Sequence, residues 1–160
     1  MVDSSPTVRQ ILGRRHVAVD IEALCEHLDQ LVGPQVAEVI MSHHEVRLGK
    51  EDAELERKEH PDVSPMEIIG KLAETWHLSG MRDVQAKLDE NGPELVVSIV
   101  NPCLRKTEGS AKSFLFSHWC GALSVILGGV FEIKNVTYDS QKDVMSARIV
   151  SRRPATTQTK

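Results

Sequence analysis

The sequence is poor in aromatic residues, has no surplus of positive charge and contains no long uninterrupted apolar run. Aromatic residues make up 4% of the chain, so its two tryptophans and three phenylalanines are more informative than usual. The formal net charge is −4, whereas nucleic-acid-binding domains usually have a basic stripe or a clearly positive charge. The longest apolar stretch, residues 119–130, is interrupted by glycines and a serine and is too short to cross a bilayer. We therefore expect neither a nucleic-acid partner nor membrane insertion.

Cysteine is also scarce. Cys25, Cys103 and Cys120 have no paired spacing, and the N-terminal residues lack the apolar core of a secretory signal. Both features favour a reducing compartment and predict a cytoplasmic protein. Zinc sites commonly use short paired spacings, but His118 and Cys120 are two residues apart on a helix and point in different directions. The sequence therefore predicts no zinc site, and it leaves haem or another apolar cofactor open.

Motifs for nucleophilic catalysis are missing as well. The chain has no serine nucleophile elbow and no phosphate-binding loop. The remaining candidates are Cys103 or Cys120 as a nucleophile, with His77 or His118 as its partner. Cys120 lies on an apolar helix face, where cysteine usually behaves as a small hydrophobe. Since every catalytic partner must be assumed, the sequence favours a non-catalytic domain over an enzyme.

The overall composition is that of one globular domain. The 160 residues include 41% hydrophobic and 26% charged residues, an ordinary mixture for a chain long enough to bury a core. Residues 1–13 are interpreted as a lead-in with a short helix over residues 6–12, and residues 151–160 as a disordered tail. A single domain is expected over residues 14–150.

Helices are expected in the first half of the chain. Apolar residues at helical spacing predict a helix that begins at Ile21 and ends at Gly33, and Pro34 suits the first turn of the next one. The highly charged residues 47–60 are interpreted as a solvated helix face or an exposed loop without a chemical role. Ser64 can then cap a third helix.

The third helix has a strong start and an apolar stripe. Ser64, Pro65 and Glu67 form a capping box with proline at the first helical position. The stripe that follows ends at Trp76, and Gly80 is expected to stop the helix.

The second half alternates between strands and one helix. Periodicity predicts four strands, over residues 84–88, 95–100, 130–138 and 143–150. Between the second and third lies a helix with one broad apolar face and a second face of small residues that permits close backbone approach, Ser117, Gly121, Ser124 and Gly128. The order β-β-α-β-β with short connections predicts an α+β fold, with the N-terminal helices on one face of a mainly antiparallel four-stranded sheet.

The aromatic residues have two interpretations. Trp76, Phe114, Phe116 and Trp119 are either plain core or part of the lining of an apolar ligand site, for which His77 and His118 would be the polar anchors. The candidate ligand-binding residues are Trp76, His77, Phe116, His118, Trp119, Leu123, Ile126 and Leu127.

The chain is similar to the 4-vinyl-reductase-like (hydrocarbon-binding) domain family, which is related in fold to TRAPP-type vesicle-tethering subunits. The resemblance rests on residues 15–19, 68–76 and 116–123, together with Gly128-Gly129 and the closing strand pair. It implies a homodimeric α+β sensor that encloses a hydrophobic small molecule, has no reductase activity and acts through a protein partner. Some members have a cysteine-rich zinc site near the last helix, but residues 137–145 contain no cysteine here.

Two functions follow as hypotheses. The first is a non-catalytic domain that binds or senses a hydrophobic or aromatic ligand and acts through a protein partner. The alternative is a dimeric scaffold or accessory subunit of a larger complex. In either case the small-residue face would serve tight helix-on-sheet packing or a dimer contact.

Overall fold

The computed structural model describes residues 21–78, 84–88, 94–100 and 111–152. Its helices and strands follow the predicted order, and their bounds are α2 (Ile21–Val32), α3 (Pro34–Glu59), α4 (Pro65–Leu78), β1 (Val84–Leu88), β2 (Leu95–Val100), α5 (Ala111–Ile126), β3 (Phe131–Asp139) and β4 (Val144–Ser151). The short helix expected over residues 6–12, Gly80 and Cys103 lie outside the described residues. Ser151 belongs to β4, so the disordered tail expected over residues 151–160 is wrong for this residue, and residues 153–160 lie outside the described residues.

The four strands form one antiparallel sheet in the order β1-β2-β4-β3, which confirms the α+β fold. Its inner face is apolar because alternate residues of the two central strands point the same way: Val97 pairs with Ala147, and both are buried. On the outer face the hydroxyl oxygens of Ser98 and Ser146 lie 2.9 Å apart. One face of the sheet therefore requires a cover of helices.

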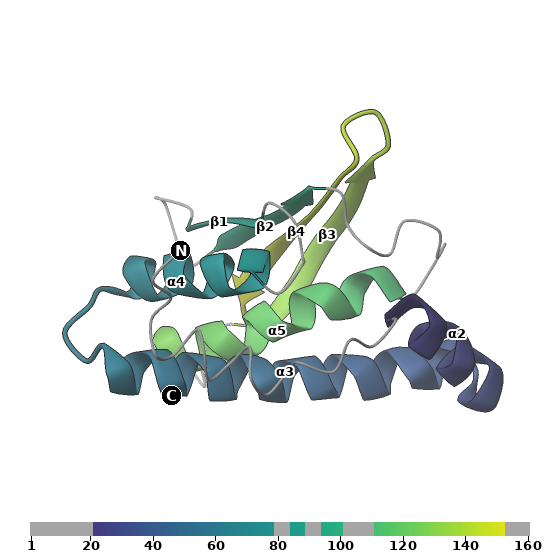
Figure 1. Cartoon of the computed structure of the whole chain (residues 1–160), viewed down its shortest axis with the longest axis horizontal. Coiled ribbons are helices and arrows are strands. Elements are labelled where there is room, and N and C mark those ends of the chain that lie inside the picture. Colours follow the sequence, from purple (N-terminus) through teal and green to yellow (C-terminus); the bar gives the residue numbers. More distant parts are fainter. Residues whose placement is uncertain (1–20, 79–83, 89–93, 101–110, 153–160) are drawn as a thin grey trace, which may run out of the picture.

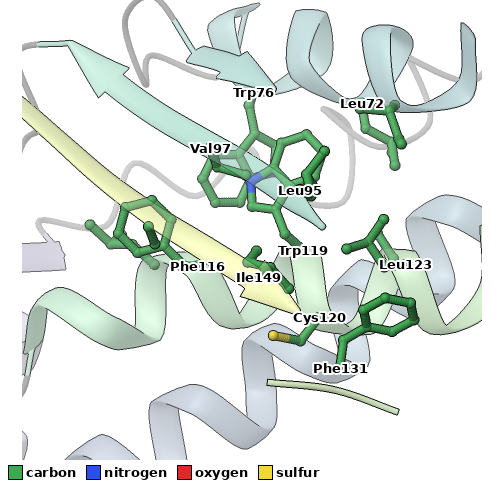
Figure 2. Packing of buried hydrophobic residues seen from close by; sticks show 14 of the residues in the cluster. Leu72, Trp76, Leu95, Val97, Phe116, Trp119, Cys120, Leu123, Phe131 and Ile149 are labelled. Carbon is green, nitrogen blue, oxygen red and sulfur yellow. The ribbon is translucent and has the colours of Figure 1, made fainter. Parts of the chain in front are cut away.

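Helices α4 and α5 provide that cover, and α3 packs on the far side of α5 (Figure 1). Helix α2 folds back against α3 at the end where α3 begins (Figure 1). The main core lies between α4, α5 and the inner face of the sheet, where large apolar side chains from all three gather (Figure 2). A second buried layer lies between α3 and the two covering helices.

Local interactions at the helix ends agree with the sequence. The Ser64 amide donates to Glu67 Oε2 over 2.8 Å, and the Glu67 amide donates to Ser64 Oγ over 3.3 Å, which confirms the capping box. These hydrogen bonds hold the pKa of Glu67 below its ordinary value. Gly128 and Gly129 adopt positive φ angles just after α5, a conformation that favours glycine.

The charged residues 47–60 differ from their interpretation. They continue α3 without interruption to Glu59, so the loop alternative is wrong. Arg47, Lys50 and Glu54 are exposed, but Asp52 and Glu56 are buried. These two are four residues apart, hence on one side of the helix, and that side faces the protein. The solvated-face interpretation is therefore wrong for them.

The small-residue face of α5 packs against α3. A Cβ atom on Gly121 would lie 2.0 Å from the Val46 carbonyl oxygen, so only glycine fits at this crossing. The close approach predicted for this face is confirmed at Gly121. At Gly121 the close neighbour is α3 of the same chain. Gly128, which was expected on the same face, lies beyond the end of α5 and has nothing within 4 Å of an added Cβ, so the close approach is not found there.

Candidate functional site

Polar and ionisable side chains are buried where α3, α4 and α5 meet. Five polar or charged residues are buried among those described: Asp52, Glu56, Thr75, Ser117 and His118. The Thr75 hydroxyl donates to the Lys71 carbonyl oxygen within α4, which accounts for its burial. The ionisable residues are harder to explain, since burial of charged groups costs free energy unless they are paired and hydrogen-bonded.

His118 lies between two carboxylates of α3. Its Nε2 atom is 3.7 Å from Asp52 Oδ2, and its Nδ1 atom is 3.9 Å from Glu45 Oε2. Both distances are within ion-pair range for a protonated imidazole. The two carboxylates flank different ring nitrogens, and the close glycine contact between α3 and α5 brings these side chains together.

Two tryptophans adjoin His118. The Trp76 ring centroid is 4.8 Å from that of His118 and 5.7 Å from that of Trp119. Trp76 and Trp119 come from α4 and α5, and both lie in the space between these helices and the sheet (Figure 2). The Trp119 Nε1 atom is buried and donates no hydrogen bond to any residue that the structure describes. The site is thus acidic on the α3 side and aromatic on the opposite side.

Glu56 extends the acidic side by one helical turn beyond Asp52. Its side chain is 0% exposed, and neither carboxyl oxygen accepts a hydrogen bond within the described parts of the chain. His60 is an ionisable neighbour, and its Nε2 atom lies 3.8 Å from Glu56 Oε2. Burial raises the pKa of Glu56; Lys71 opposes this effect, whereas the Asp52 charge adds to it.

The predicted site residues divide into two groups. Most of them are buried in one connected cluster: Trp76, Phe116, His118, Trp119, Leu123 and Ile126. His77 and Leu127 are exposed, so the structure does not bring them to the cluster, and only His118 of the two proposed histidine anchors is in the interior. The ligand-binding role of every one of these residues stays a prediction.

The sequence pattern did not predict the acidic side of the site. Glu45, Asp52 and Glu56 occur within or beside a highly charged stretch, which made them look solvated. Gly49 and Ala53 fall between them at helical spacing, and both are buried. Small residues that recur every four positions in a charged helix indicate a close packing face, and this pattern could have identified the buried side of α3.

The structure gives little support to the cysteines as catalytic nucleophiles. Cys103 lies outside the described residues. Burial, together with the smaller effect of the nearby Glu132 charge, raises the pKa of the Cys120 thiol to about 12. Because the thiolate is the reactive form, Cys120 is a poor nucleophile at neutral pH.

Two features are absent among the described residues. None of their histidines, cysteines and acids form a group of three or more arranged to hold a metal ion. In the same part of the chain, no helix combines the length and the apolar character needed to cross a membrane.

Comparison with known proteins assigns no family to this arrangement. No protein-family model matches the chain, and no curated protein is similar enough to match it.

Proposed function

We propose that this chain is a non-catalytic domain that binds a hydrophobic or aromatic small molecule between α4, α5 and the sheet, and that it acts in the cytoplasm through a protein partner. One observation carries the proposal: His118 is buried between Asp52 on one side and the rings of Trp76 and Trp119 on the other. Ligand sites are mostly apolar with a few polar anchors. The same mixture is found here.

The free-energy cost of this arrangement supports a function beyond core packing. Buried ion pairs are often no better for stability than apolar residues of similar volume. A chain that needed only a packed interior at this place could use leucine or phenylalanine there. Departures of this kind from simple packing are expected mainly at functional sites.

The resemblance to the 4-vinyl-reductase-like family supports the same proposal. The resemblance covers about residues 14–150 and implies a ligand of hydrocarbon-like or aromatic character. Membership of that family is itself part of the proposal. Its zinc site is not, because Cys120 has no neighbouring cysteine in residues 137–145.

Native mass spectrometry of freshly purified protein tests ligand binding directly. We expect a small molecule to be retained by the wild type. The substitution Leu123→Trp adds volume to the fully buried cluster and should abolish retention. Val130→Trp introduces the same side chain at a position that is exposed, and should leave retention unchanged. Equal retention by both variants would count against the proposed location.

A second candidate function, the dimeric scaffold or accessory subunit, is favoured by the surface of α2 and α3. Leu31 on α2 is 69% exposed and Val39 on α3 is 68% exposed. Val36 and Ile40 are also exposed, on the same side of α3 as Val39. Exposed apolar groups at helical spacing commonly mark protein–protein contacts.

Sedimentation velocity tests this second function. If α2 and α3 form a dimer contact, Val39→Lys should convert a dimer to a monomer at micromolar concentration. Val130→Lys changes an exposed apolar residue elsewhere and should leave the dimer intact. A wild-type monomer over the whole concentration range would exclude homodimerisation as the function of this surface.

A further inference from the structure

We infer that the exposed apolar surface of α2 and α3 binds residues 6–12 of the same chain, a segment outside the described residues. This inference does not depend on the ligand site. It concerns the surface on which the second candidate function rests, and it names an occupant other than a second copy. Three features carry it: the concentration of exposed apolar side chains, the charges of the two segments and the reach of the chain that leads into α2.

Exposed apolar side chains are concentrated in one short part of the chain. The two helices that carry them contact each other, and α2 folds back against the start of α3 (Figure 1). Proteins rarely leave a large apolar surface in contact with water, because its hydration costs free energy. A cover over α2 and α3 is therefore expected. Half of the large hydrophobic residues that are exposed among those described fall within residues 24–40, namely Leu24, Leu31, Val32, Val36, Val39 and Ile40.

Residues 6–12 have the apolar face that such a cover needs. Val8, Ile11 and Leu12 recur at helical spacing in the short helix that the sequence predicts there. Gln10 falls on the opposite side of the same helix. A helix with one apolar and one polar side is stabilised when its apolar side packs against another apolar surface.

The charges of the two segments are complementary. Residues 4–19 contain no acidic residue and three arginines, Arg9, Arg14 and Arg15. Residues 21–46, which include α2 and the first half of α3, contain five acidic residues and no lysine or arginine. The summed charge of a surface attracts a segment of opposite sign. The arginine-containing segment is therefore attracted to the part of the chain that carries the exposed apolar residues.

The same charges disfavour a second copy as the occupant. Glu38 and Glu45 already have partners within the chain, but Glu26 of α2 is exposed and Asp29 is partly exposed. A symmetric contact through this surface would bring the acids of one copy close to those of the other. Like charges repel, whereas the arginines of residues 4–19 reduce the negative charge.

The chain between the two segments is long enough for this contact. Residues 13–20 separate Leu12 from the start of α2 at Ile21, and eight extended residues span about 26 Å. Helix α2 has 12 residues and is about 18 Å long. Residues 6–12 can therefore reach either end of α2. Their attachment gives them a roughly millimolar effective concentration at the surface, far above that of a free copy at micromolar concentration.

Methyl NMR spectroscopy of the full chain tests the inference. In the wild type we expect nuclear Overhauser contacts (NOEs) from the methyl groups of Ile11 and Leu12 to those of the exposed apolar residues of α2 and α3. Sedimentation velocity of the same sample should show a monomer, because the segment and the surface belong to one chain.

Two matched variants locate the contact. Leu12→Asp and Gln10→Asp introduce the same side chain into the same predicted helix, on opposite sides. Leu12→Asp should abolish the NOEs, because it places a carboxylate on the apolar side, whereas Gln10→Asp should retain them. Unchanged methyl signals from Val97 and Ile149, which are buried under the helices, check that both variants keep the fold.

The outcomes separate the possible occupants. An absence of NOEs in the wild type, or NOEs that respond equally to the two variants, overturns the inference. NOEs that arise only between labelled and unlabelled chains in a mixed sample also overturn it, because the segment then binds a second copy. A wild-type dimer that lacks the NOEs and dissociates on Val39→Lys excludes this inference and supports the second candidate function. A monomer without the NOEs excludes both occupants, and ligand binding is tested separately by native mass spectrometry.

Discussion

Gly49 of α3 and Gly121 of α5 lie at the crossing of the two helices, and each glycine leaves room for the backbone of the opposite helix. A Cβ atom on Gly49 would lie 1.9 Å from the His118 carbonyl oxygen, and one on Gly121 would lie 2.0 Å from the Val46 carbonyl oxygen. Real Cβ atoms do not approach backbone so closely, so the helices would have to separate. The contact thus determines how far His118 lies from Asp52 and Glu45.

Substitution of either glycine should therefore destabilise the protein. We expect Gly121→Ala to lower the free energy of unfolding by about 3 kcal/mol, the upper part of the usual range for overpacking, because the obstructing atoms are backbone. Urea unfolding measures the effect. Gly70→Ala is the matched control: it lies in α4 with nothing within 4 Å of the added Cβ, and should increase stability by roughly 0.5–1 kcal/mol. Equal effects at the two sites would contradict the proposed crossing.

The pairing of His118 with Asp52 leads to a second prediction. His118→Leu leaves the buried Asp52 carboxylate without its imidazole neighbour and should cost roughly 3–5 kcal/mol at pH 7. The double variant His118→Leu/Asp52→Leu removes both members and should recover part of this loss. Urea unfolding of His118→Leu, Asp52→Leu and the double variant gives the coupling energy between the two side chains. Strictly additive effects would show that the two side chains do not interact.

Much of the fold could be predicted because local patterns and tertiary packing agree. The Ser64–Glu67 capping box and the glycine pair after α5 act within a few residues, so the sequence displays them directly. Alternation along β2 and β4 likewise predicts which side of each strand is buried, since one face of the sheet is covered and the other is not. The small-residue face of α5 was also recognisable as a place of close approach.

The site was less predictable because its partners are distant in the sequence. His118 meets Asp52 across more than sixty residues of chain, a relationship that no local pattern contains. The buried side of α3 was hidden because Asp52 and Glu56 look like ordinary surface charges. Trp76 and Trp119 were identified, but their link to the acidic residues of α3 runs through His118 and depends on the α3–α5 crossing at Gly49.

Cys120 should resist alkylation in the folded protein. A thiol with a pKa of about 12 is almost entirely protonated at pH 8, and the side chain is also buried. We expect iodoacetamide to leave Cys120 unmodified under native conditions and to modify it in concentrated urea. Peptide mass mapping identifies the modified cysteine. Rapid native modification of Cys120 would contradict its burial and would revive the nucleophilic alternative.

The raised pKa of Glu56 predicts how stability depends on pH. Since the folded protein holds this proton more tightly than the unfolded chain, the contribution of Glu56 is complete below its ordinary value of 4.5 and is lost as the pH rises through the folded pKa. Between pH 4.5 and 7.5 the wild type should therefore lose more stability than Glu56→Gln, which has no proton to release. Glu54→Gln removes an exposed acid two residues away, on the solvent side of the same helix, and should follow the wild-type profile. Urea unfolding across this range measures all three proteins. If the Glu56→Gln profile runs parallel to that of the wild type, the Glu56 carboxyl is solvated in the folded protein and the acidic side of the site is open to water.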